Sequence, residues 1–140
     1  MKRIVVEDNP LIAKFYRYVL EHDGYSVTAT ESGDETLRLA GAPETVAVIL
    51  DVSLRATFVE GRAIDGLELG RLLKADPATR GVSVIIATAH AMAGDRERFL
   101  RESGADGFIR KPITDPTELT ALINRLAEGR SGRRNDPSAP

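Results

Sequence analysis

The sequence predicts a single α/β domain in which helices pack on both faces of a mostly parallel sheet. Short runs of β-branched and aliphatic residues alternate with longer segments of helical periodicity, the pattern of successive strand and helix units. The chain has 140 residues and 42% of them are hydrophobic, which suffices for one core but not for two comfortable domains. We therefore expect one domain over residues 1–129.

The strands are predicted where aliphatic residues cluster between turn-forming residues. The first run follows the initial Met-Lys-Arg, and the longest central run is VAVIL. Runs of this length are typical of strands that are buried on both faces of a sheet. The expected strands are Arg3–Val6, Tyr25–Thr30, Val46–Leu50, Val82–Ala87 and Gly107–Ile109.

The first three helices are predicted from their starts and from their apolar spacing. One begins at Asn9 or Pro10, carries Leu11, Ile12, Phe15 and Val19, and ends near Gly24. The next begins where Ser32 and Glu35 have the spacing of a capping box. Another buries Leu69, Leu72 and Leu73 before Pro77 ends it.

The last two predicted helices differ in their apolar content. The segment of about Gly94 to Ser103 has only Phe99 and Leu100 as large apolar residues, so we expect it to be weakly anchored. The final helix has Leu119, Leu122, Ile123 and Leu126 on one face, Asp115 and Pro116 at its start, and Gly129 as its expected end. Residues 130–140 have no apolar side chain larger than alanine, so we expect a disordered tail with no output domain after it.

Composition excludes several classes of function. The formal charge of −2 argues against a chain built to bind nucleic acid, which needs clustered Lys and Arg. The absence of cysteine excludes disulfides and thiolate metal sites and fits a cytoplasmic protein. No run approaches the roughly 18 apolar residues of a membrane span, so we expect no membrane partner.

Polar side chains follow four of the predicted strands at the point where each strand ends. These are the adjacent Glu7 and Asp8, then Asp51, Thr88 and Lys111. The carboxyl ends of parallel strands meet at one edge of a sheet, so these side chains should form one pocket. Carboxylates at such short range repel one another and need a cation, and oxygen ligands suit Mg²⁺, with Mn²⁺ as a substitute.

A hard cation beside a carboxylate, a lysine and a hydroxyl is the equipment for phosphoryl transfer. The metal and the ammonium neutralise phosphoryl oxygens, while a carboxylate can act as the nucleophile. Asp51 is the candidate acceptor because it stands alone at the end of the longest central apolar run.

The chain resembles the receiver domain of bacterial two-component response regulators from about residue 2 to 128. The resemblance is carried by VVEDNP, VILDVSL, DGLEL, IIATAHAM and GADGFIRKPI. It implies a flavodoxin-like sheet of five strands in the order 2-1-3-4-5, with five helices. It also implies a phosphorylation-dependent signalling switch rather than an enzyme, whose partners are a sensor histidine kinase or a histidine phosphotransfer protein and an unknown downstream protein.

The resemblance assigns a role to each candidate site residue. Asp51 would take the phosphoryl group from phosphohistidine, Thr88 and Lys111 would engage its oxygens, and Phe108 would be the aromatic switch. The metal would be held by Glu7, Asp8, Asp51 and the backbone carbonyl of Ser53. The Lys111–Pro112 bond resembles one that is usually cis. We expect His90 to face solvent.

Two departures from the family pattern stand out. Arg55 occupies the position of a usual proline, and Gly66 arrives only after the additional segment RATFVEGRAI. We interpret this segment as a tolerated surface excursion beside the pocket, with a functional lid as the alternative. Glu7 replaces a more common aspartate, which lengthens one metal arm.

Three alternatives remain open at this point. A degenerate receiver would act only as a binding module, although its pocket residues are intact. A phosphatase of the haloacid dehalogenase type would need an acid where Ser53 stands. A flavodoxin-like cofactor carrier would need a phosphate loop where Glu7 and Asp8 lie.

Overall fold

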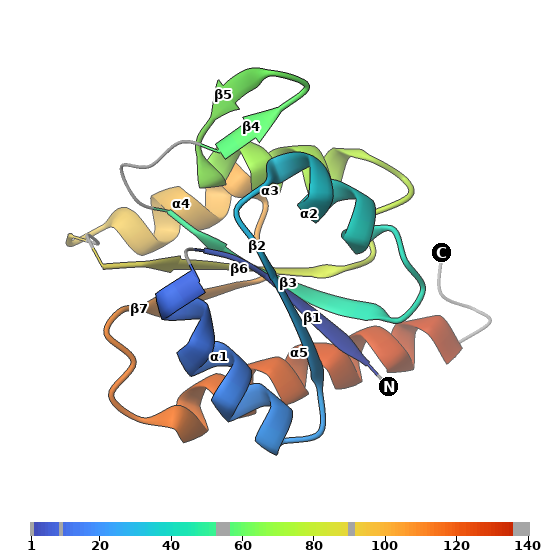
Figure 1. Cartoon of the computed structure of the whole chain (residues 1–140), viewed down its shortest axis with the longest axis vertical. Helices are drawn as coiled ribbons and strands as arrows, with labels where there is room; N and C mark the ends of the chain where they lie inside the picture. Colours follow the sequence, from blue (N-terminus) through green and yellow to red (C-terminus); the bar gives the residue numbers. More distant parts are fainter. Residues whose placement is uncertain (1, 9, 53–56, 90–91, 136–140) are drawn as a thin grey trace.

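The computed structural model describes residues 2–8, 10–52, 57–89 and 92–135, and it confirms the predicted α/β architecture (Figure 1). Five parallel strands form the main sheet in the order β2-β1-β3-β6-β7, which is the expected order 2-1-3-4-5 once an inserted strand pair is set aside. The strands of this sheet are β1 (Arg3–Glu7), β2 (Ser26–Thr30), β3 (Thr45–Asp51), β6 (Ser83–Thr88) and β7 (Gly107–Arg110).

Helices cover both faces of the sheet. One face carries α1 (Pro10–His22) and α5 (Pro116–Asn135), and the other carries α2 (Gly33–Ala40), α3 (Gly66–Ala75) and α4 (Asp95–Ser103) (Figure 1). Each face has its own apolar core. Tyr16, Leu20 and Ile123 fill the core beneath α1 and α5, whereas Leu69, Leu73 and Phe99 fill the core beneath α2, α3 and α4.

Alternation along β3 explains why one strand supplies both cores. Ala47 and Ile49 face the α1 and α5 core, while Val48 and Leu50 face the opposite core, and all four are fully or nearly fully buried. Because neither face of this strand meets water, its sequence reads as a continuous apolar run. Asp51 is the last residue of the strand and pairs in register with Ala87.

The helix starts follow the predicted capping chemistry. The hydroxyl of Ser32 accepts a hydrogen bond from the backbone N–H of Glu35 at 3.1 Å, as its spacing predicts. Asp65 caps α3 in the same way through the N–H of Glu68. In α4 the buried residues are Phe99 and Ser103, so the predicted weak anchoring of this helix is confirmed.

The last helix is longer than the sequence predicts. α5 continues to Asn135, past the expected end at Gly129 and into the segment expected as a tail. An interior glycine costs a helix about 1 kcal/mol but ends it only if the backbone turns left-handed there, and Gly129 lies within α5. No helix in the described part of the chain has the length and apolar content needed to cross a membrane.

The additional segment after β3 is an antiparallel hairpin rather than an irregular loop. Strands β4 (Thr57–Val59) and β5 (Arg62–Ile64) pair with each other and lie beside α2 and α3 (Figure 1). The two turn residues, Glu60 and Gly61, have φ of 50° and 79°, as a tight two-residue hairpin turn requires. This regular structure over the described residues 57–64 was not predicted, and the VEGR turn between β-branched residues was the overlooked signal.

Candidate functional site

Three of the predicted site residues meet at the carboxyl edge of the sheet. The Lys111 ammonium lies 3.1 Å from Oδ2 of Asp8 and 2.9 Å from Oδ1 of Asp51. The side chains of Asp8 and Asp51 are only 2% and 8% exposed, and that of Lys111 is 12% exposed. Residues that are far apart in the sequence therefore form one nearly buried ion cluster, as the strand ends predict.

Backbone hydrogen bonds position each member of this cluster. The N–H of Asp8 donates to the carbonyl of Thr30, so the acid is tied to the end of β2. The N–H of Val52, directly after Asp51, donates to the carbonyl of Ala87. The N–H of Lys111 donates to the carbonyl of Thr88 at 2.8 Å. The pocket is thus built from strand ends that are already paired in the sheet.

The start of α3 packs tightly against the acceptor strand. A Cβ at Gly66 would lie only 2.8 Å from the carbonyl oxygen of Asp51 and 3.0 Å from the side chain of Val52. No side chain fits at that distance, which explains the glycine in the DGLEL motif. The first residue of α3 therefore contacts the backbone of Asp51 directly.

The electrostatics of the cluster keep the lysine charged. Burial by itself would lower the pKa of Lys111, but hydrogen bonds and charges from Asp51 and Asp8 outweigh it and raise the pKa above 10.5. One ammonium balances two carboxylates, so the cluster keeps a net negative charge at neutral pH. Such a cluster can attract a cation and can also expose a carboxylate as a nucleophile.

Glu7 is the last residue of β1 and directly precedes Asp8. It is 2% exposed and pairs in register with Leu50, whose side chain belongs to the core beneath α2, α3 and α4. No group of three or more acidic or histidine side chains suited to a metal occurs within residues 2–8, 10–52, 57–89 and 92–135.

The remaining predicted site residues have different outcomes. Thr88 is the last residue of β6, 1% exposed, and pairs in register with Arg110 beside the cluster. Ser53, the expected source of a metal-binding carbonyl, and His90, expected to face solvent, both lie outside the described residues. The Lys111–Pro112 bond is cis, as predicted.

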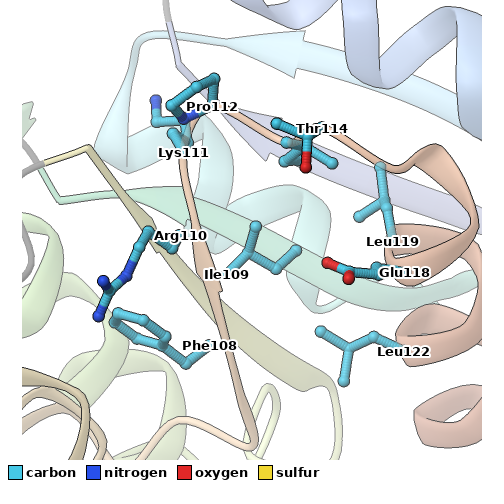
Figure 2. Close-up of a pocket in the computed structure, with 10 residues that line it drawn as sticks. Phe108, Ile109, Arg110, Lys111, Pro112, Thr114, Glu118, Leu119 and Leu122 are labelled. Carbon is cyan, nitrogen blue, oxygen red and sulfur yellow. The ribbon is translucent and has the colours of Figure 1, made fainter.

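The predicted switch residue, Phe108, lies on β7 at one side of a cavity of about 510 Å³. Figure 2 shows Phe108 and Arg110 on one side of the strand, while Ile109 points toward Leu119 and Leu122 of α5. The rings of Phe108 and Phe99 are 6.4 Å apart between centroids, which links β7 to α4. A displacement of Phe108 would therefore change its contact with Phe99 and could shift the weakly anchored helix α4.

A second cavity, of about 420 Å³, lies between α1 and Lys111. It is lined by Ile12, Phe15 and Tyr16 of α1, together with Ala89, Lys111, Pro112 and Ile113. Leu11 and Tyr18 on the same helix are 77% and 79% exposed. The surface next to the ion cluster is thus apolar and open.

Sequence reasoning missed Tyr16 as a neighbour of the site. Its ring is fully buried, and its hydroxyl has no hydrogen-bond partner within the part of the chain that the structure describes. Burial and the charges of Asp8 and Asp51 raise its pKa well above the ordinary value of 10. A polar atom on an otherwise apolar helix face was the available signal.

The fold and the ion cluster define a class of protein, and the comparisons agree with it. The family model of the response regulator receiver domain matches residues 4–124. The chain therefore belongs to the response regulator receiver family, the signalling switches of two-component systems.

Among particular proteins, the chain is similar to the polar-differentiation response regulator DivK of Brucella ovis. The two are 35% identical over 125 residues, which cover 89% of this chain and 95% of DivK. Family membership disfavours both the phosphatase and the cofactor-carrier alternatives.

Solved structures show the same similarity. The receiver domain of sensor histidine kinase PA1611 from Pseudomonas aeruginosa PAO1 is 29% identical, with a TM-score of 0.74 over 91% of this chain and 98% of that one. That crystal structure has a magnesium ion coordinated in its active site cleft. The receiver domain of a histidine kinase from Syntrophus aciditrophicus is 30% identical, with a TM-score of 0.75 over 100% and 98% of the two chains.

Proposed function

We propose that Asp51 accepts a phosphoryl group from phosphohistidine on a sensor histidine kinase or a histidine phosphotransfer protein, in a Mg²⁺-dependent reaction in the cytoplasm. The observation that carries this proposal is the single ammonium of Lys111, which contacts both Asp8 and Asp51 in one nearly buried pocket. The phosphorylated protein then signals through contacts with a downstream protein. Family membership supports the same function.

The donor set of the pocket fits a hard divalent cation. Asp8 and Asp51 present nearly buried carboxylate oxygens on either side of one ammonium, and oxygen is the ligand that Mg²⁺ prefers. Asp8 and Asp51 would hold the ion, with Glu7 and the carbonyl of Ser53 as further proposed contributors; Mn²⁺ would be a substitute. When bound, the metal would offset negative charge on the transferred group.

The side chains of this chain divide the chemical work. An oxygen of the Asp51 carboxylate attacks phosphorus in line, so an O–P bond forms while the P–N bond breaks and its electron pair returns to the imidazole. Lys111 is close enough to the acceptor to exchange its ion pair with Asp51 for one with a phosphoryl oxygen. Thr88, buried at the end of the next strand, would supply a hydroxyl to another oxygen.

The apolar surface of α1 is the proposed docking place of the phosphoryl donor. Ile12 and Phe15 line the cavity beside Lys111, and Leu11 and Tyr18 extend the apolar surface toward solvent. Exposed apolar patches of this kind commonly mark protein contacts. The donor would thus deliver its phosphohistidine to the pocket edge next to Asp51.

Replacement of the acceptor tests this function. In the presence of Mg²⁺ and acetyl phosphate, the wild-type protein should form an alkali-labile acyl phosphate, which mass spectrometry detects as an added phosphoryl group. Asp51→Asn keeps the shape but removes the nucleophile, so labelling should disappear. Asp23→Asn, an acid outside the pocket, is the control and should label normally.

Two results would contradict the assignment in different ways. Undiminished acyl phosphate in Asp51→Asn would mean that another residue is the acceptor. Failure of the wild-type protein to react with acetyl phosphate and with every histidine kinase tried would favour the degenerate receiver, which acts only by binding. Mg²⁺ chelation that leaves labelling unchanged would remove the metal from the proposal.

A further inference from the structure

The hairpin β4–β5 is held in the body of the domain at both of its ends. Thr57, its first residue, is 4% exposed, and Ile64, its last, is 3% exposed and belongs to the core beneath α2, α3 and α4. Val59 packs against the same core. A surface loop that is merely tolerated would not bury its own ends, so this segment is an integral part of the fold.

The hairpin is bonded to the loop that joins β2 to α2. The hydroxyl of Thr57 donates to the carbonyl of Glu31 at 3.1 Å. The N–H of Glu60 donates to both carboxylate oxygens of Asp34, at 3.0 and 3.3 Å. A Cβ at Gly33 would lie 2.7 Å from the Val59 side chain, so hairpin and helix are in direct contact. The base of the hairpin is thus attached to the β2–α2 loop and its tip to α2.

The same loop is attached to the acid side of the pocket. The carbonyl of Thr30 accepts the N–H of Asp8 at 3.2 Å, and the Thr30 hydroxyl accepts the N–H of Ser32. On the other side, the hairpin leads from Ile64 through Asp65 directly into α3, whose first residue, Gly66, lies against the backbone carbonyl of Asp51. The hairpin therefore connects Asp8, through the β2–α2 loop, with Asp51, through the start of α3.

We propose that hairpin β4–β5 is a brace that sets the spacing between Asp8 and Asp51. In the proposed function Asp8 and Asp51 would together hold the metal, so this part of the inference rests on that function. The spacing itself does not depend on it. Thr57 and Asp34 are therefore positioning residues that act on the pocket from outside it.

Amide hydrogen exchange without metal or phosphate tests the brace directly. Thr57→Val and Asp34→Ala each remove one attachment and leave the pocket side chains intact. Exchange at the N–H groups of Asp8 and Val52 should become about fivefold faster, the effect of losing roughly one hydrogen bond. The matched controls are Thr120→Val, which removes a similar hydroxyl on α5, and Glu35→Ala, which removes a carboxylate from the same turn of α2.

The pattern of exchange decides the outcome. Acceleration confined to residues 57–64, with Asp8 and Val52 unchanged, would overturn the brace whether or not the protein is ever phosphorylated. If either variant fails to fold, the other one carries the test, since each interrupts this connection at a different point.

Titration with Mg²⁺ alone, followed by NMR, provides a second readout. Loss of the brace should weaken Mg²⁺ binding about tenfold, as is common when groups that orient metal ligands are removed. Affinity within twofold of the wild type in both variants would remove the link to the metal. A wild-type protein that binds no Mg²⁺ would instead count against the proposed function, and the exchange experiment would still decide the brace.

Discussion

Lys111 is the residue on which the balance of charge in the pocket depends. Its ammonium contacts Asp8 and Asp51, both of which are nearly buried. A buried ion pair adds little net stability, yet removing one partner is costly because the other charge is left without compensation. The lysine therefore stabilises the domain mainly by preventing repulsion between the two carboxylates.

Lys111→Met should accordingly lower the free energy of unfolding by about 3 kcal/mol, measured by urea denaturation at neutral pH. The apolar stem is kept, so the loss reflects charge. Asp51→Asn in the same background should restore a large part of the loss, because it removes one of the uncompensated acids. A double variant no more stable than Lys111→Met would show that the carboxylates are not coupled through the lysine.

Tyr16 links stability to alkaline pH. Burial raises the pKa of its phenol in the folded state, with Asp8 and Asp51 adding to the shift, whereas the unfolded chain titrates near 10. Above pH 10 the unfolded state therefore releases a proton that the folded state keeps, so stability falls as the pH rises.

Tyr16→Phe should flatten the decline of unfolding free energy above pH 10, where the wild type loses stability. At neutral pH it should be neutral or stabilising by about 1 kcal/mol, because it removes a buried hydroxyl that has no partner among the described residues. Tyr18→Phe, exposed on the same helix, is the control and should change neither value. A marked loss of stability in Tyr16→Phe would indicate an ordered water bound to the hydroxyl.

At the scale of elements, the hairpin turn places a glutamate, Glu60, in a backbone conformation that favours glycine or asparagine. Glu60 is the one non-glycine residue with a positive φ within the described ranges, and a left-handed conformation costs such a residue about 1–2 kcal/mol. Its N–H nevertheless donates to the carboxylate of Asp34. The strain accompanies an attachment of the hairpin to α2.

Glu60→Asn should relieve this strain, because Asn-Gly is the preferred sequence for the turn and the N–H to Asp34 is retained. We expect the free energy of unfolding to rise by about 1 kcal/mol in urea denaturation. Glu60→Ala removes the same charge but tolerates the left-handed region no better, so it should bring no gain. Equal stability of the two variants would mean that the turn is not strained.

Helices and strands with a clear hydrophobic periodicity could be predicted from the sequence. Features that depend on the backbone conformation of a single residue could not. The five strands of the main sheet and the five helices follow from aliphatic runs, capping residues and breakers in the sequence. The hairpin was missed because a two-residue turn with glutamate at its first position is an uncommon signal. The end of α5 was misplaced because Gly129 stops a helix only when its backbone turns left-handed.

At the scale of the whole molecule, the site could be predicted in part. Parallel strands bring their carboxyl ends to one edge, so the meeting of Asp8, Asp51 and Lys111 follows from topology. The position of Tyr16 beside the cluster depends on how α1 packs on the sheet, which the sequence does not show.

The weak anchoring of α4 gives a prediction for the response of the molecule. Phosphorylation adds charge and oxygens that Lys111 can engage only by leaving its present contacts. Segments with low local stability move most readily, and α4 buries only Phe99 and Ser103. A complete reversal of populations needs about 5.5 kcal/mol, so we expect a partial shift that partner binding completes.

NMR spectra recorded with acetyl phosphate and Mg²⁺ should therefore show shift changes in β7 at Phe108 and throughout α4. Residues on the outer face of α5 should change little, which provides an internal control within the same spectra. Changes restricted to the immediate surroundings of Asp51 would contradict a response through Phe108 and α4.

The sheet separates the two apolar cores of the domain. Asp51 lies at the carboxyl edge of the sheet, whereas Phe108 and Phe99 belong to the core beneath α2, α3 and α4. The helix α1 packs on the opposite face, so α1 and α4 present separate surfaces to binding partners. A phosphoryl donor bound to α1 and a downstream protein bound to α4 would occupy different surfaces. Both could therefore be bound to the domain at the same time.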